Sequence, residues 1–250
     1  MTKADLHVHT SNSHDGILDY DEIVSEYYTR GYRLIAITDH DKLTIKSVQK
    51  YMDMTVIPGE EITSENGTHI IGLYLKEEIP SGLPEIDIVQ RIKAQGGLVV
   101  IPHPLRNGSG LLKVVIGKSN LTDIIQKADF IETISYKEYL NDITEQTVVR
   151  EIANYIPQNS TVKFIASSDA HTKFQLGKCA TFFEGQGFET PDELLQKQVV
   201  SKNCSVNSVS KVLSKLLKRV YRTLFIDILN LDYEKRKKIK KFFLGGKFNA

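Results

Sequence analysis

Short apolar runs alternate with amphipathic stretches along the first 200 residues of the chain. Runs such as L-I-A-I-T and L-V-V-I are rich in β-branched residues and are typical of buried strands. Between the runs, apolar residues recur at helical spacing, and several of these stretches end at a glycine. The pattern predicts strands over 4–9, 33–41, 55–63, 68–75, 98–104, 130–135, 162–171 and 177–184, and helices over 18–30, 43–51, 84–95, 121–128, 144–155 and 190–200.

The repeated strand–helix order predicts an α/β fold in which parallel strands are joined by crossover helices. A barrel of such units suits 250 residues. We expect residues 1–205 to form this domain and residues 206–250 to form a separate basic, helical C-terminal extension.

Histidines and carboxylates gather where the predicted strands end. His7 and His9 flank one residue, so on a strand both rings point to the same side. Asp15 follows in a polar loop, and six of the seven histidines of the chain fall in such places, which leaves out His14. Imidazole and carboxylate groups together are typical ligands of transition metals. The spacing therefore predicts a metal centre at one end of the barrel.

The motifs D-L-H-V-H-T with the following D-G, I-T-D-H-D, P-G-E-E-I, H-I-I-G, I-P-H-P and S-D-A-H resemble, in order, those of the PHP (polymerase and histidinol phosphatase) family of metal-dependent phosphoesterases. The resemblance implies a distorted seven-stranded (β/α) barrel of the TIM-like type, in a small stand-alone member. It also implies two or three divalent ions of manganese, iron or zinc. It places one ion on His7, His9, Glu61 and Asp169, a second on Asp15, His40 and His171, and a third on His69 and His103 with Glu61 bridging.

The resemblance further implies hydrolysis of a phosphate ester by a metal-bound hydroxide at a di- or trinuclear centre. A proton for the leaving group would come from water, from His171 or from Asp39, although a role in orienting His40 fits Asp39 better. Arg106 lies three residues beyond His103, where it either binds a phosphate with both guanidinium nitrogens or is a solvated loop residue.

The expected substrate is a phosphorylated small molecule or a nucleotide. Two enzymatic alternatives remain open, a nuclease that cleaves phosphodiesters and a histidinol-phosphate phosphatase. A non-enzymatic alternative is a metal-stabilised scaffold that acts through its basic extension.

The extension carries most of the charge asymmetry of the chain. Residues 211–250 hold 12 Lys or Arg and three acidic residues, whereas residues 1–210 hold 20 basic and 28 acidic residues. Apolar positions recur at helical spacing from 209 to 229 and predict a helix that packs on the barrel. Nucleic acid, an anionic membrane surface or an oligomer interface are the other partners that this stretch fits.

The remaining composition is that of an ordinary globular protein, with 41% hydrophobic and 25% charged residues. No apolar run is long enough to predict a membrane span, and the first residues are too polar for a signal peptide. Cys179 and Cys204 are too few and too far apart to predict a disulfide framework. We therefore expect a cytoplasmic protein, and the sequence does not indicate its oligomeric state.

Overall fold

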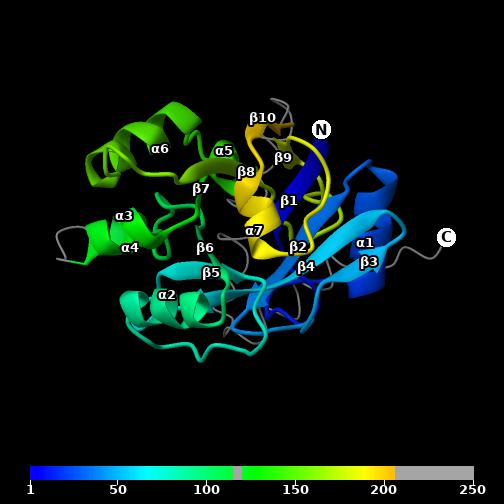
Figure 1. Cartoon of the computed structure of the whole chain (residues 1–250), viewed down its shortest axis with the longest axis horizontal. Coiled ribbons are helices and arrows are strands. Elements are labelled where there is room, and N and C mark those ends of the chain that lie inside the picture. The colour runs from blue at the N-terminus through cyan, green and yellow to red at the C-terminus, as the bar shows by residue number, and fades with distance from the viewer. Residues whose placement is uncertain (115–119, 206–250) are drawn as a thin grey trace, which may run out of the picture.

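A strongly curved sheet forms the centre of the computed structural model, which describes residues 1–114 and 120–205 (Figure 1). Its strands are β1 (Thr2–Val8), β2 (Leu34–His40), β3 (Gln49–Tyr51), β4 (Met54–Thr63), β5 (His69–Leu73), β6 (Leu98–Ile101), β7 (Phe130–Ser135), β8 (Lys163–Ser167), β9 (Cys179–Phe183) and β10 (Val199–Cys204). The helices are α1 (Tyr20–Thr29), α2 (Glu85–Ala94), α3 (Leu111–Val114), α4 (Leu121–Lys127), α5 (Tyr136–Leu140), α6 (Glu145–Ile152) and α7 (Pro191–Gln196).

Seven strands form the wall of a nearly closed barrel, in the order β1-β2-β4-β5-β6-β7-β8. A parallel bridge between Val8 and Ala170 brings the end of β1 against the chain that leaves β8. The antiparallel pair of β9 and β10 continues the sheet from the outer side of β1, and β3 pairs with β4 alone. The predicted α/β barrel is thereby confirmed.

The sheet is mixed, so the prediction of parallel strands throughout is wrong. β5 runs antiparallel to both of its neighbours, β4 and β6, and β9 runs antiparallel to both β1 and β10. The reason at β4 and β5 is the short connection between them, where the backbone N–H of Gly67 bonds to the carbonyl of Ser64 and Gly67 has φ +79°. A connection of this length allows a hairpin but no crossover helix.

The helix predicted over 43–51 is absent, because the side chains there bond and pack in an extended chain. Thr44 donates a hydrogen bond to the Asp39 carboxylate, and Leu43 and Ile45 are buried on either side of it. The segment then ends in β3, which pairs antiparallel with Met54–Val56 of β4. The β-branched Thr44, Ile45 and Val48 favour this pairing over a helix.

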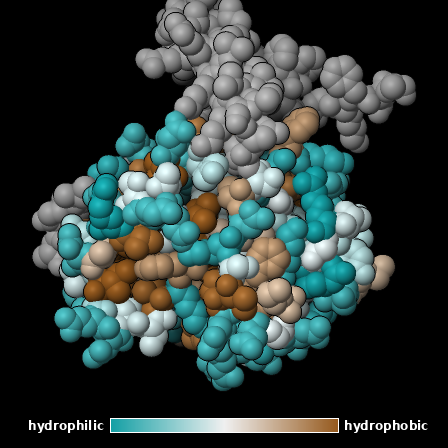
Figure 2. Space-filling model, turned by 90° about the horizontal axis from the view of Figure 1, so that it is seen from above, coloured by the Kyte–Doolittle hydropathy of each residue, from teal (hydrophilic) through white to brown (hydrophobic). Residues whose placement is uncertain are grey.

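Three clusters of buried apolar side chains hold the elements together. One lies between the sheet and the helices α2, α4 and α6, the second fills the barrel around Leu6, Ile57 and Phe130, and the third lies beneath α1. Figure 2 shows the outside from above, where polar residues in teal surround brown apolar ones. Capping boxes fix the first turns of α1, at Asp19, and of α7, at Thr190.

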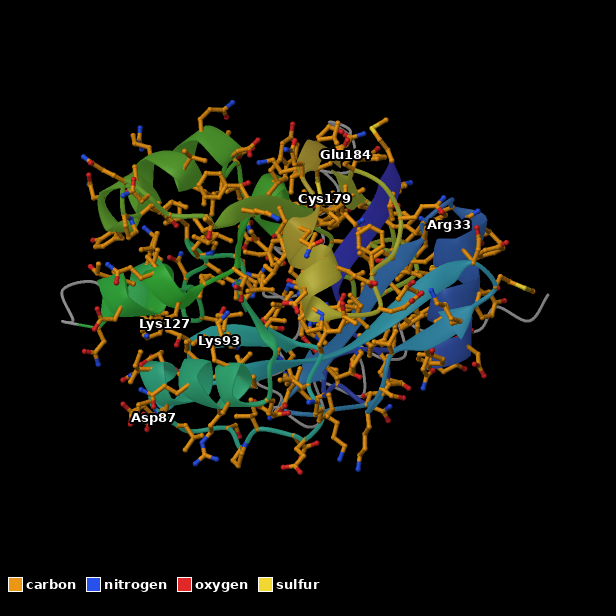
Figure 3. The ribbon with its side chains drawn as sticks, viewed as in Figure 1. Arg33, Asp87, Lys93, Lys127, Cys179 and Glu184 are labelled. Atoms are coloured by element: carbon orange, nitrogen blue, oxygen red, sulfur yellow. A yellow bond between two sulfur atoms is a disulfide. The ribbon has the colours of Figure 1, made fainter. Side chains whose placement is uncertain are left out.

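The C-terminal part of the barrel domain differs from the prediction in two ways. The helix expected over 190–200 ends at Gln196, and the chain continues as β10. Cys179 and Cys204 face each other across β9 and β10 and form a disulfide, which corrects the expectation drawn from their number and separation (Figure 3). Antiparallel pairing of β9 with β10 brings together two cysteines 25 residues apart, and sequence spacing alone does not show this.

Among the described residues, no helix is long and apolar enough to cross a membrane. The basic extension predicted over 206–250 lies outside the described residues.

Candidate metal centre

The first two histidines reach the barrel mouth through an irregularity in β1. The pairing of β1 with β2 shifts between Asp5 and Val8. Leu6 therefore packs inside the barrel, while the next residue, His7, also faces inward at the site. The rings of His7 and His9 lie on the same side, 4.9 Å apart between centroids, as the one-residue spacing predicts.

Strand alternation selects the ligands that β2 and β4 contribute. On β2, Leu34 and Ala36 belong to the interior cluster, and His40 continues this series at the end of the strand. On β4, Ile57 is interior and Glu61 follows four residues later, whereas Glu60 points to the other face and accepts a hydrogen bond from the Ile79 backbone. The sequence argument that only one of the two glutamates faces the site agrees with this geometry.

His69 lies at the beginning of its strand rather than at the end. Because β5 runs antiparallel to β4, its first residue pairs with Thr63, at the same rim where the parallel strands end. The reversal of β5 thus explains why this histidine joins the others despite its position at a strand start.

His103 and Asp169 occupy the strained left-handed region, with φ of 28° and 51°. Each lies two residues beyond the last residue of the strand that leads to the rim, β6 for His103 and β8 for Asp169. Non-glycine residues adopt such angles rarely, and they do so most often at functional sites. This turn directs each side chain toward the centre of the cluster.

The Glu61 carboxylate lies at the centre of five imidazoles. Its Oε2 atom is 3.0 Å from His7 Nε2, 3.1 Å from His9 Nε2 and 3.3 Å from His40 Nδ1. Its Oε1 atom is 2.9 Å from both His69 Nδ1 and His103 Nε2. Because imidazole nitrogens lie close to both of its oxygens, the Glu61 carboxylate has the arrangement needed to bridge two ions.

Asp169 and Asp15 complete the other side of the cluster. Asp169 Oδ1 lies 3.2 Å from His9 Nε2 and 3.4 Å from His171 Nδ1. Asp15 Oδ2 lies 2.8 Å from His171 Nε2, and its other oxygen is 3.9 Å from His40 Nε2. The nine side chains that the sequence singled out as ligands therefore converge on one site.

Within this site, three sets of ligand atoms lie within 4.8 Å of one another. The sets are His7, His9, Glu61 and Asp169; His9, Asp15, His40 and His171; and His40, Glu61 and His69. The first set matches the predicted first ion, and the second contains the predicted ligands of the second ion. His103 joins the third group through its contact with Glu61.

The separations between these atoms fit a bound ion. Nitrogen and oxygen ligands about 2.0–2.2 Å from one ion lie roughly 3.0–3.5 Å from each other. The distances from His7 and His9 Nε2 to Glu61 Oε2 and Asp169 Oδ1 run from 3.0 to 3.5 Å. His9 Nε2 and both carboxylate oxygens of Asp169 are also buried and receive no well-oriented hydrogen bond from described residues. Buried polar atoms of this kind are satisfied when they coordinate a metal.

Burial and neighbouring charges move the histidine pKa values in opposite directions. Burial lowers the pKa of His40 to about 3 and that of His171 to about 4, so both rings are neutral and available as ligands at neutral pH. Burial also opposes charge on His7, but attraction to Glu61, Glu132 and Asp169 outweighs it and raises the pKa of His7. A metal must therefore displace a proton from this ring.

Two further side chains hold the ligands in position. Glu132, on β7, accepts from His7 Nδ1 at 2.8 Å and from the His103 backbone N–H at 2.9 Å. A carboxylate behind a histidine fixes the ring so that its other nitrogen faces the metal. Ser13 donates to Asp15 and accepts from the His40 backbone N–H, which ties the first loop to β2.

Asp39 lies apart from the cluster, because alternation on β2 turns it to the face opposite His40. Its two oxygens accept hydrogen bonds from the backbone N–H and hydroxyl of Thr10 and from the Thr44 hydroxyl. These bonds join the first loop to the chain after β2. The two roles that the sequence offered for Asp39, as an acid and as a residue that orients His40, stay predictions.

A cationic edge flanks Asp169. Arg106 Nη2 is 2.8 Å and Lys137 Nζ is 3.1 Å from Asp169 Oδ2, and both cations help to keep the pKa of Asp169 well below its usual value against the effect of burial. Glu138 holds the guanidinium through bonds of 2.8 and 3.1 Å to Nε and Nη2. The sequence indicated Arg106 but missed Lys137 and Glu138, which directly follow β7 at the same rim in the unpredicted helix α5.

Comparison with known proteins places this geometry in context. The PHP domain family matches residues 5–117, and the PHP-associated family matches residues 150–197. An uncharacterized protein of Methanocaldococcus jannaschii is 36% identical over 116 residues, which cover 41% of this chain and 67% of that protein. A 5'-3' exoribonuclease of Haemophilus influenzae is 34% identical over 88 residues, 32% of each chain. The lesion-specific endonuclease EndoQ of Pyrococcus furiosus superposes with a TM-score of 0.58 at 16% identity, over 80% of this chain and 58% of that one.

Proposed function

Because the chain belongs to the PHP domain family of metal-dependent hydrolases, we propose that it hydrolyses phosphate esters at a centre of two or three divalent ions. Nine residues would hold the ions: His7, His9, Asp15, His40, Glu61, His69, His103, Asp169 and His171. The observation that carries the proposal is the convergence of these side chains, at separations that fit metal coordination, around Glu61. Manganese, iron and zinc all suit this donor set.

Bound ions in such a centre acidify water and neutralise phosphoryl oxygens. The other charged groups of the site serve binding and orientation. Arg106 and Lys137 stand side by side at Asp169 and would bind the phosphate oxygens that the ions leave free. Glu138 fixes the plane of the Arg106 guanidinium, and Glu132 fixes the His7 ring.

The leaving alcohol needs a proton, and the sequence offered water, His171 and Asp39 as donors. Hydrogen bonds occupy the Asp39 carboxylate on the other face of β2, so we assign it a structural role. His171 has a pKa of about 4 and serves as a ligand, which makes it a poor acid at neutral pH. We therefore propose that solvent delivers the proton.

Nucleic acid is the second candidate substrate class. It is favoured by the relative named as a 5'-3' exoribonuclease and by the fold shared with a lesion-specific endonuclease. No contact of the described residues favours a histidinol phosphate over other monoesters.

The test is a hydrolysis screen with Mn²⁺-loaded protein on nucleotides, histidinol phosphate, p-nitrophenyl phosphate and short oligonucleotides. Asp169→Asn should abolish hydrolysis, because it removes a buried ligand and its two cationic contacts. Asp53→Asn is the matched control, since Asp53 is an exposed residue paired with Arg33 away from the site. A wild-type protein that binds no metal and hydrolyses none of these esters would favour the scaffold alternative.

A further inference from the structure

A pocket of about 570 Å³ lies beside the metal centre, and residues of α3, α5 and α6 contribute to its lining. It is lined by Leu105, Arg106, Asn107, Lys113, Glu138, Asn141, Ile143 and Thr147. Arg106 belongs to both places, because it lines the pocket and its Nη2 atom is 2.8 Å from Asp169 Oδ2. A molecule bound to Arg106 at the metal centre can therefore extend directly into this pocket.

The size of the pocket indicates more than a phosphate group. Protein sites for small organic ligands run from about 300 to 1,000 Å³, and this pocket falls within that range. A phosphomonoester of a short alcohol would leave it empty. The pocket therefore fits the organic part of a larger ester.

The lining is mixed in a way that suits a nucleotide. Leu105 and Ile143 offer apolar surface for a base or sugar, and Asn107 and Thr147 offer hydrogen-bonding groups. The charge of Arg106 is matched by Glu138 and Asp169. Lys113 is exposed and has no ion pair to a described residue, so it adds a positive charge at the outer end.

We propose that this pocket binds the nucleotide unit adjacent to the scissile phosphate of an oligonucleotide, with Lys113 on the next phosphate. The inference rests on the proposed phosphoesterase function and names its substrate class. Arg106 would then separate two phosphate positions, one over the metal centre and one at Lys113. A substrate with two successive phosphates can occupy both positions at once, whereas a phosphomonoester can occupy only one of them.

The contribution of the positive charge of Lys113 to substrate binding is tested with Lys113→Ala. Lys127→Ala is the matched control. Lys127 is an exposed lysine on the outer helix α4 and does not line the pocket (Figure 3). The substrates are the dinucleotide pApA and whichever of p-nitrophenyl phosphate or bis(p-nitrophenyl) phosphate the wild-type protein hydrolyses. Lys113→Ala should lower kcat/KM for pApA about tenfold more than for the nitrophenyl ester, the size of one charge-assisted hydrogen bond. Lys127→Ala should not change this ratio.

The need for free volume in the pocket is tested with Thr147→Trp, which fills the pocket. The control is Thr147→Ser, which keeps the hydroxyl. The tryptophan variant should lose pApA hydrolysis selectively, whereas the serine variant should retain it. Equal loss on both substrates from Thr147→Trp, or equal ratios for Lys113→Ala and Lys127→Ala, would overturn the inference.

Binding of fluorescently labelled pApA, followed by anisotropy, tests the pocket independently of catalysis. Wild-type protein should bind the probe, and Lys113→Ala should weaken binding about tenfold. A protein that hydrolyses nitrophenyl esters but binds pApA without dependence on Lys113 contradicts this inference alone. A protein that hydrolyses no phosphate ester contradicts the proposed function instead.

Discussion

Glu61 and Glu60 are adjacent carboxylates with opposite surroundings, and they form a matched pair for mutation. Glu61 contacts five imidazoles, whereas Glu60 contacts the Ile79 backbone on the other face of β4. Glu61→Gln should lower metal affinity by more than the roughly 10–100-fold found when a supporting residue is lost. Glu60→Gln should leave metal affinity within about twofold of wild type. Titration of the metal-free protein with Mn²⁺ measures both, and equal losses would show that the ligand assignment on β4 is wrong.

Glu60 also gives a prediction for the pH dependence of stability. Burial raises the pKa of this carboxyl to about 7, from an unfolded value of 4.5, and its Oε1 atom has no hydrogen bond among the described residues. Because the folded pKa is the higher one, its contribution to stability is complete below pH 4.5 and is lost as the pH rises toward 7. Glu60→Gln should remove this loss and stabilise the protein at pH 8 by on the order of 1–3 kcal/mol.

Urea unfolding of both proteins at pH 5 and pH 8 checks this expectation. The difference in unfolding free energy between mutant and wild type should grow with pH. A mutant that is less stable than wild type by the same amount at both pH values would show that Glu60 is ionised without penalty.

At the scale of elements, α2 is held against the sheet by close approach at two glycines. A Cβ atom at Gly72 would lie 2.9 Å from Ile92 Cγ1, and one at Gly97 would lie 3.1 Å from Ile92 Cγ2. Ile92 is fully buried, so Ile92→Ala should cost about 2–4 kcal/mol of unfolding free energy. Ile86→Ala, on the same helix but half-buried, should cost clearly less. Urea unfolding measures both, and equal costs would mean that α2 does not pack as described.

The sequence predicts the elements well where a local pattern decides them. The helices before Gly31 and Gly96 and the strands that carry His40, Glu61 and His103 lie where periodicity placed them. The helix expected over 43–51 fails because pairing with β4, a contact outside the segment, decides its conformation. The antiparallel direction of β5 depends on the same kind of non-local choice.

The candidate site likewise contains residues that a local motif predicts and residues that only non-local contacts reveal. The candidate ligands can be singled out because each lies in a short sequence motif, in most cases near the end of a strand. Lys137 and Glu138 have no such motif, and only the contacts with Asp169 and Arg106 in the folded chain reveal them. Asp39 shows the reverse case, since it lies next to His40 in the sequence, whereas its described hydrogen bonds go to Thr10 and Thr44.

At the scale of the whole molecule, the part of the chain beyond the described residues gives the fourth prediction. The apolar stripe at 209–229 predicts a helix that packs on the barrel, so a chain truncated after residue 205 should expose the matching surface. We expect the truncated protein to have a lower Tm and lower solubility than the full chain. Thermal unfolding and sedimentation of both proteins measure this.

A different result would assign the extension to binding. If the truncated protein stays stable and hydrolyses small esters normally but loses activity on oligonucleotides, the basic residues recruit the substrate. That loss should be larger at low salt, because electrostatic contacts with polyanions are stronger there.

The pairing of β1 with both β2 and β9 has a consequence for folding during synthesis on the ribosome. β1 is synthesised well before β9, its second neighbour, which ends at Phe183, so one edge of β1 stays unpaired for on the order of ten seconds or more of synthesis. The site likewise needs His7 from the start of the chain and His171 from far along it. The full set of candidate ligands is therefore complete only after residue 171 has been synthesised, and a product of translation that stops before residue 169 carries most of the histidines without this set.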